Sequence, residues 1–410
     1  MIAMYRIRQE DATASIEDPH GETARKLRES GILVEKGMRI GIAVGSRGIH
    51  ALDRICRSVA DFLIEQGAVP FIIPAMGSHG GATPEGQREV LAGYGITEET
   101  MGIPVAAGME VEQLDTPGCE CRVFLSREAL QADGVILINR VKPHTDFHGR
   151  YESGLVKMAV IGLGKHVQAR EIHKFGVRGL RELIPVAAGH IFSTGKILAG
   201  VAVVENRCDR PVHIEVLHGA AIMENEPRLL ELAAGNMPRL PVDIIDVLIV
   251  DYIGKDFSGT GLDTNVIGRI RIRGEREPEH PSIGSIFIRD ISERSHGNAL
   301  GIGLADVITR RLFDQINFGV MYENAFTSTF LERVKIPVIA ENDREGFRFA
   351  LRCCGSIPVG TERVVRISNT LRTDEVHVSE QVLKDIGYRP DITVIEGPFP
   401  LFTITELSTL

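Results

Sequence analysis

The chain alternates short apolar runs with glycine-rich turns and longer segments that are apolar on one side only. Residues 39–44, 69–77 and 133–139 are mainly apolar runs of strand length, which is typical of buried strands. Between the first two runs, residues 51–67 repeat their apolar positions every three or four residues, as one face of a helix does. A later helix is expected to begin at Thr83-Pro84, since threonine caps helices and proline is accepted at their first position. This strand–turn–helix rhythm predicts an α/β fold with a mostly parallel sheet and helices on both of its faces.

A proline-containing stretch divides the sequence into two parts. It spans residues 237–241, and a new apolar strand pattern begins after it at residues 247–250. We therefore expect two α/β domains, with the cofactor and catalytic residues in residues 1–240 and a second domain, residues 241–410, closing the cleft. Ligands of parallel sheets bind beyond the carboxyl ends of the strands, so the active site is expected on the loops that follow the early strands, in the cleft between the domains.

Composition and charge narrow the class of partner. The 410 residues carry 46 basic and 55 acidic side chains, a formal net charge of −9, and they include no tryptophan. This balance argues against binding to nucleic acid or to an anionic membrane surface. No apolar run approaches the roughly 18–20 residues that span a bilayer, and the six cysteines form no paired C-x-x-C pattern. We expect a cytoplasmic protein whose partner is a small molecule.

Candidate chemistry gathers in the loops that follow the predicted strands. His79, His144 and His173 lie in turns or at helix starts on the ligand side, and imidazole exchanges protons near neutral pH. Lys157 is the only charge in an apolar run, where loss of water would make its amine a nucleophile or a covalent anchor. Arg47 offers a planar fork that suits a carboxylate. For each of these side chains, an ordinary solvated surface role remains the alternative.

Standard phosphate-binding loops are not complete in this sequence. Gly162-Leu163-Gly164-Lys165-His166 resembles the end of a P-loop, but it lacks the first glycine and the Ser or Thr that would hold magnesium. The Gly-x-Gly motifs also lack the third glycine of a dinucleotide fingerprint. Proton transfer on a small anionic substrate fits the candidate residues better than nucleotide hydrolysis or nicotinamide chemistry.

These motifs resemble those of the nickel-dependent lactate racemase family, whose members carry a nickel-pincer nucleotide. The resemblance covers roughly residues 10–275 and is strongest in Pro143-His144, Lys157 and His173, which lies sixteen residues after the lysine. It implies that His144 is a catalytic acid/base, that Lys157 holds the cofactor covalently, and that His173 is the protein ligand of nickel. Similarity of the Gly-Ser-His turn makes His79 the second acid/base. Ser46-Arg47 resembles a family motif whose arginine binds the substrate carboxylate, a role that falls to Arg47.

The resemblance weakens where the family contacts its substrate. Leu262-Asp263-Thr264-Asn265 is similar to a family motif, and Arg271 stands where the lactate enzymes have a substrate-binding lysine. Val44 and Ile267-Gly268 replace an acid and a Tyr-Gln pair, and the stretch between His144 and Lys157 is slightly longer. The resemblance thus implies a racemase or epimerase that inverts C2 of a 2-hydroxy acid other than lactate.

Two other functions remain open from sequence. A cofactor-free lyase or isomerase could use Lys157 as a base or Schiff-base former. A non-catalytic protein that binds small anions or nickel could keep the cleft without turnover. The sequence does not identify the hydroxy acid, separate racemisation from epimerisation, or give the oligomeric state.

Overall fold

The computed structural model describes residues 2–10, 13–46 and 48–402, which form two compact units. The N-terminal unit spans Thr13–Asn236, and the C-terminal unit combines the beginning of the chain with the segment from Met237 onward. The predicted change of domain near residue 240 therefore lies close to the observed one. The expected domain of residues 1–240 was wrong at its start, because β1 (Ala3–Gln9) pairs antiparallel with two strands of the C-terminal unit.

The N-terminal unit is built on a five-stranded sheet of order β3-β2-β6-β7-β8. Its first four strands are parallel, and β8 runs antiparallel to β7. The bounds of these strands are β2 (Arg39–Val44), β3 (Val69–Pro74), β6 (Gly134–Arg140), β7 (Ile197–Glu205) and β8 (Pro211–His218). The three strands predicted from the early apolar runs are thus confirmed as β2, β3 and β6, which lie side by side.

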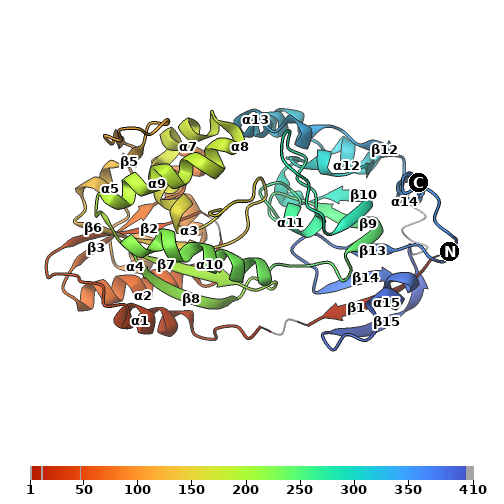
Figure 1. Cartoon of the computed structure of the whole chain (residues 1–410), viewed down its shortest axis with the longest axis horizontal. Coiled ribbons are helices and arrows are strands. Elements are labelled where there is room, and N and C mark those ends of the chain that lie inside the picture. Colours follow the sequence, from red (N-terminus) through yellow and green to blue (C-terminus); the bar gives the residue numbers. More distant parts are fainter. Residues whose placement is uncertain (1, 11–12, 47, 403–410) are drawn as a thin grey trace. The chain divides into compact units, whose positions relative to one another are not determined.

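Helices cover both faces of this sheet, as predicted. On β6, Val135 and Leu137 enter one apolar core, and Ile136 and Ile138 enter the other, because successive side chains of a strand point to opposite faces. Figure 1 shows α1 and α2 on one side of the strands and α7 and α9 on the other. The helices are α1 (Pro19–Glu29), α2 (Leu52–Glu65), α3 (Pro84–Gly93), α4 (Glu98–Met101), α5 (Arg127–Gln131), α6 (Leu155–Lys157), α7 (Lys165–His173), α8 (Gly176–Arg178), α9 (Ile184–Ser193) and α10 (Ile222–Gly235). A short hairpin, β4 (Val111–Gln113) and β5 (Phe124–Ser126), stands apart from the main sheet.

The C-terminal unit contains an eight-stranded mixed sheet of order β12-β11-β10-β9-β13-β14-β1-β15. Five neighbouring strands, from β12 to β13, are parallel, and the remaining three are antiparallel. The strands are β9 (Ile244–Ile253), β10 (Ser282–Ile291), β11 (Val307–Thr309), β12 (Val338–Ala340), β13 (Val364–Ile367), β14 (Glu375–Ser379) and β15 (Ile392–Pro400). The helices are α11 (Thr264–Ile267), α12 (Arg310–Asp314), α13 (Phe318–Ser328), α14 (Asp343–Cys353) and α15 (Glu380–Ile386). Across the described ranges, no helix has the length and apolar character needed to cross a membrane.

Candidate active site

The loops after β2 and β3 meet at the carboxyl edge of the N-terminal sheet. Ser46, just beyond β2, places its Oγ 2.5 Å from Nδ1 of His79, which follows β3. Parallel neighbours end at the same edge, so this contact follows from the strand order. His79 is exposed there. Arg47, the predicted carboxylate ligand, lies outside the described residues, and its role stays a prediction.

Close backbone packing fixes the turn that carries His79. Gly80 has a φ of +64°, and a Cβ at this position would lie 2.5 Å from the backbone of Gly86. Both positions therefore need glycine. The hydroxyl of Thr83 accepts the Gly86 N–H at 3.1 Å and caps α3, which confirms the helix start predicted at Thr83-Pro84. The loop that carries His79 therefore packs closely against the beginning of α3.

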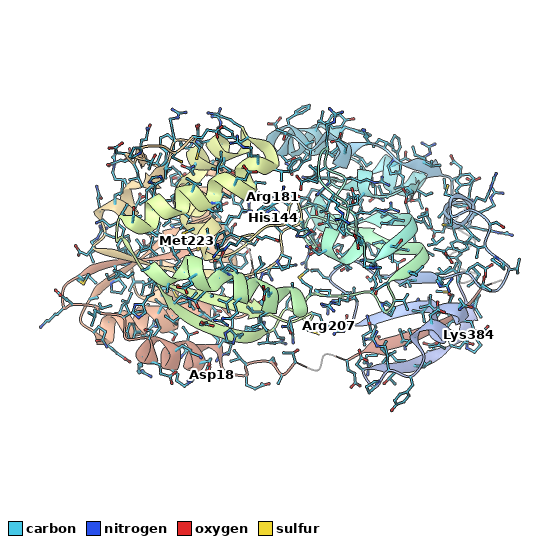
Figure 2. The ribbon with its side chains drawn as sticks, viewed as in Figure 1. Asp18, His144, Arg181, Arg207, Met223 and Lys384 are labelled. Carbon is cyan, nitrogen blue, oxygen red and sulfur yellow. The ribbon has the colours of Figure 1, made fainter. Side chains whose placement is uncertain are left out.

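A buried carboxylate organises the loop that carries His144, beyond β6. Glu152 is 6% exposed, and its Oε2 accepts the backbone N–H of His144 at 2.6 Å. Its Oε1 accepts the N–H of Gly149 at 3.1 Å. Two hydrogen bonds connect the loop to its surroundings: Arg181 donates to the carbonyl of His148 at 2.8 Å, and Tyr151 of the loop donates to the carbonyl of Met223 at 2.7 Å. Figure 2 labels His144, Arg181 and Met223. The loop thereby presents His144 in one defined orientation.

The imidazole of His144 contacts the amine of Lys157. The ring is 8% exposed, and its Nε2 lies 2.5 Å from Nζ of the lysine. The backbone N–H of Asp146 donates to the other ring nitrogen, Nδ1, at 3.0 Å. Because Nδ1 accepts this bond, Nε2 is the ring nitrogen that faces the amine. The contact places a primary amine, which can form covalent bonds, beside an imidazole, which exchanges protons near neutral pH.

Two consecutive helical segments carry Lys157 and His173. Lys157 ends α6, and a π-helical turn at Met158–Gly162 follows it. After a break at Lys165, whose φ is +56°, α7 continues to its last residue, His173. Such π turns are frequent at functional sites. Burial lowers the pKa of His173, and the positive charge of a protonated Lys157 would lower it further, whereas Asp146 opposes this. His173 is thus held as neutral imidazole, the form that binds metals.

Lys165 supports the His79 turn and was missed as a functional residue. Its side chain is fully buried, and its Nζ donates to the carbonyl of Pro74 at 2.6 Å and to Oε1 of Gln87 at 3.2 Å. Gln87 in turn donates to the carbonyls of Gly77 and His79, at 3.1 and 3.3 Å. Burial lowers the pKa of Lys165 to about 8. The Gly-x-Gly-Lys motif, judged only as an incomplete phosphate loop, was the available signal.

Glu226 binds the backbone just before Lys157, and the sequence analysis did not identify it as a site residue. The residue lies on α10, is 1% exposed, and accepts the backbone N–H of Val156 at 3.0 Å. A Cβ on Gly154 would lie 2.5 Å from the carboxyl carbon of Glu226, so glycine is required for this close approach. Burial raises the pKa of Glu226 to about 7. In the sequence, nothing distinguishes this glutamate from the other acids of an amphipathic helix.

Replacing Glu226 with glutamine is expected to flatten the dependence of stability on pH. An unfolded glutamate releases its proton near pH 4.5, but the folded protein keeps it until about pH 7, so stability falls as the pH rises between these values. The loss amounts to about 3 kcal/mol. Glu226→Gln mimics the protonated form and should be more stable than the parent at pH 8 but not at pH 4. Urea unfolding at several pH values measures this. Glu224→Gln, which changes an exposed acid of the same helix, should show the same change of unfolding free energy with pH as the parent. If Glu226→Gln also kept the parental pH dependence, the raised pKa would not belong to Glu226.

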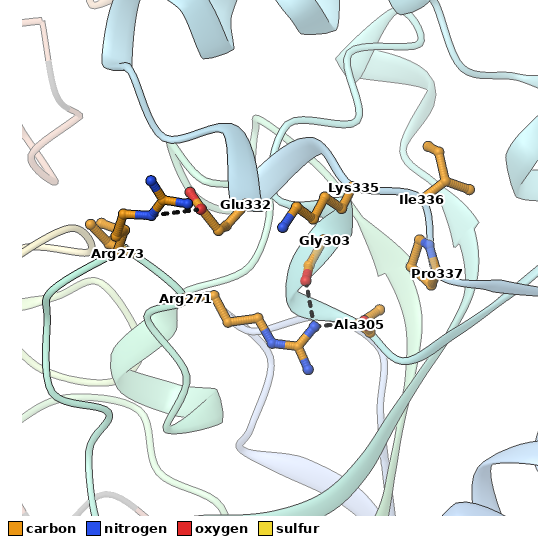
Figure 3. A pocket seen from close by; sticks show the side chains of 9 residues that line it. Arg271, Arg273, Gly303, Ala305, Glu332, Lys335, Ile336 and Pro337 are labelled. Atoms are coloured by element: carbon orange, nitrogen blue, oxygen red, sulfur yellow. Dashed lines mark hydrogen bonds and ion pairs between the residues drawn. The ribbon is translucent and has the colours of Figure 1, made fainter.

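Arg271 lies in the C-terminal unit, where its guanidinium already has partners. It forms an ion pair with Asp306 at 2.7 Å and donates to the carbonyls of Gly303 and Ala305, at 2.7 and 3.2 Å. The residue lines a cavity of about 350 Å³ together with Lys335 and others (Figure 3). Its predicted contact with a substrate stays a prediction. The preceding Leu-Asp-Thr-Asn motif has a local role, because Oδ1 of Asp263 caps α11 at 3.0 Å.

Comparison with known proteins identifies the fold. No protein-family model and no curated protein matches the sequence. Among solved structures, the lactate racemase apoprotein from Thermoanaerobacterium thermosaccharolyticum matches with a TM-score of 0.51 and 12% identity, over 89% of this chain and 94% of that one. A protein from Thermotoga maritima matches with a TM-score of 0.44 and 14% identity, over 68% of this chain and 71% of that one. The chain therefore has a mixed α/β fold similar to that of lactate racemase.

Proposed function

We propose that the protein is a racemase or epimerase that inverts C2 of a 2-hydroxy acid other than lactate. The observation that carries the proposal is the 2.5 Å contact between Nζ of Lys157 and Nε2 of His144, with His173 at the end of the following helix, α7. An amine beside one imidazole, with a second, partly buried imidazole whose pKa is lowered, is an unusual combination for a structural cluster. The fold similar to lactate racemase supports the same interpretation.

The cluster fits a nickel-pincer nucleotide attached at Lys157. The amine of Lys157 lies beside the imidazole of His144, which could take the proton that the amine releases on covalent attachment. His173 supplies one neutral imidazole, a ligand that suits nickel. Among the described residues, no group of three or more His, Cys, Asp or Glu side chains is placed to hold a metal ion. In this proposal the remaining ligands therefore come from the nucleotide. When bound, the group supplies an electrophile that takes the hydrogen of C2 with its electron pair and returns it.

The protein's own task in this mechanism is to move the hydroxyl proton of the substrate. Loss of hydrogen from C2 leaves a planar 2-keto acid, and its return to the opposite face inverts the centre. Each face needs a base of its own, and His79 and His144 are the two imidazoles proposed. In this proposal, Nε2 of His144, which contacts Nζ of Lys157 in the bare chain, would accept the hydroxyl proton of the substrate. Arg47 and Arg271 are proposed to hold the carboxylate during turnover.

A stereochemical assay on loaded protein tests the proposal. The protein is purified from cells that make the pincer nucleotide, and its intact mass and nickel content are measured. Single enantiomers or epimers from a panel of 2-hydroxy acids are then followed by chiral chromatography. We expect an adduct at Lys157, about one nickel per chain, and inversion of at least one substrate. Loaded protein that inverts no member of a broad panel would favour a binding role instead.

A cofactor-free isomerase or lyase is the second candidate. It is favoured by the same contact, because an amine beside a proton acceptor could form a Schiff base with a carbonyl substrate. Protein that has never met the nucleotide is incubated with 2-keto acids and borohydride. A stable mass increase at Lys157 would support this candidate, whereas an unchanged mass would exclude it.

A further inference from the structure

We propose that Cys119 and Cys121 form a disulfide, making the loop between β4 and β5 a thiol-oxidation site. Their sulfur atoms lie 3.6 Å apart in the reduced protein, which is van der Waals contact. The chain bends at Glu120 and Cys121, which brings the two cysteine side chains together. Cys121 enters the apolar core, and Cys119 packs against it. Closing the pair to a bond of about 2.05 Å needs only a small movement of the loop.

The two thiols of the pair differ in reactivity and exposure. Burial, followed by the contact with Cys119, raises the pKa of the Cys121 thiol to about 12. The Cys121 thiol is therefore mostly protonated at neutral pH, and its attack on a mixed disulfide at Cys119 is expected to be the slow step, because only the thiolate attacks. Cys119 is only partly buried and is the one that an external oxidant can reach.

The proposed exchange uses a low-molecular-weight disulfide as the oxidant. The Cys119 thiolate attacks one sulfur of oxidised glutathione, forms a mixed disulfide and releases one glutathione thiolate. Cys121 loses its proton to solvent or to that thiolate and attacks the Cys119 sulfur. The second glutathione leaves, and an internal disulfide remains. The two cysteines lose two electrons in total, and one oxidised glutathione becomes two reduced molecules.

Oxidation of the pair should also affect α7, the helix that carries His173, because residues next to the two cysteines bind α7. Arg122 forms an ion pair with Glu171 of α7 at 3.0 Å, and Gln168 of α7 accepts the N–H of Phe124 at 2.7 Å. Glu120, between the cysteines, pairs with Arg178 of α8. Drawing the two sulfurs together pulls on Glu120 and Arg122, so the disulfide should loosen the end of α7.

Intact mass and peptide mapping of the full chain test the proposal without any need for activity. Reduced protein treated with oxidised glutathione should lose two hydrogen masses in a bond mapped to Cys119 and Cys121. Cys121→Ser should instead keep a glutathione adduct on Cys119, and Cys119→Ser should form no internal bond. Cys208→Ser, which removes an exposed cysteine elsewhere, should behave as the parent.

Two results would overturn the inference. A parent protein that only accumulates mixed disulfides at Cys119 would show that the pair does not close. An internal bond with unchanged hydrogen exchange across residues 165–178 would show that oxidation is not transmitted to α7. Neither outcome depends on the proposed racemase, since the reagents and readouts need no cofactor or substrate.

Discussion

Replacing Lys157 with alanine is expected to abolish both cofactor attachment and turnover. The variant loses the amine that would bond to the pincer nucleotide, so its intact mass should equal that of the bare chain after growth with the cofactor. Without the electrophile, inversion at C2 should fall by at least about three orders of magnitude, or about 4 kcal/mol of barrier. We expect a large effect because Lys157 offers the amine that lies beside His144, the proposed acid/base.

Two variants sharpen this test. Lys157→Arg keeps a long cationic side chain but offers no amine for attachment, so it should fail as completely as the alanine variant. Lys384→Ala changes an exposed lysine of the C-terminal unit and should retain adduct, nickel and turnover. Full nickel loading and normal turnover in Lys157→Ala would remove the lysine from the mechanism.

The position of the candidate site followed from the sequence because it depends on strand order. Apolar runs identify β2, β3 and β6, and parallel neighbours bring the loops of Ser46, His79 and His144 to one edge. The contact between His144 and Lys157 did not follow. It depends on Glu152, which folds the loop inward through the N–H groups of His144 and Gly149. No local pattern reveals that a glutamate will be buried for this purpose.

The features that sequence reasoning missed share a physical origin in contacts between distant segments. Strand β1 is short and half polar, and its partners lie more than 360 residues away, so its unit could not be inferred from the boundary near residue 240. Glu226 meets the backbone of Val156 across 70 residues. Burial of Lys165 depends on acceptors from β3 and α3. In each case a backbone group is among the deciding partners, and the side-chain pattern of a single sequence does not show such contacts.

Changing His79 or His144 to glutamine should stop inversion while leaving the two enantiomers unequally affected. Glutamine keeps a polar side chain but transfers no proton, which typically costs about 10²- to 10⁴-fold in rate, or about 3–5 kcal/mol. Each imidazole is proposed to serve one face of the planar keto acid. Each variant should therefore lose the interconversion of the keto acid with one of the two enantiomers. Trapping the 2-keto acid with a hydrazine should yield product from only one enantiomer in His79→Gln and from the other in His144→Gln.

The controls for this experiment are the cofactor content of the two variants and a histidine outside the candidate site. Both variants should retain the Lys157 adduct and nickel, since neither replaces Lys157 or His173. His213→Gln changes a histidine of β8 that pairs with Glu215 and should racemise as the parent does. If one variant lost keto-acid formation from both enantiomers and the other lost neither, a single histidine would serve both faces. The two-base mechanism would then be wrong, although the covalent role of Lys157 would stand.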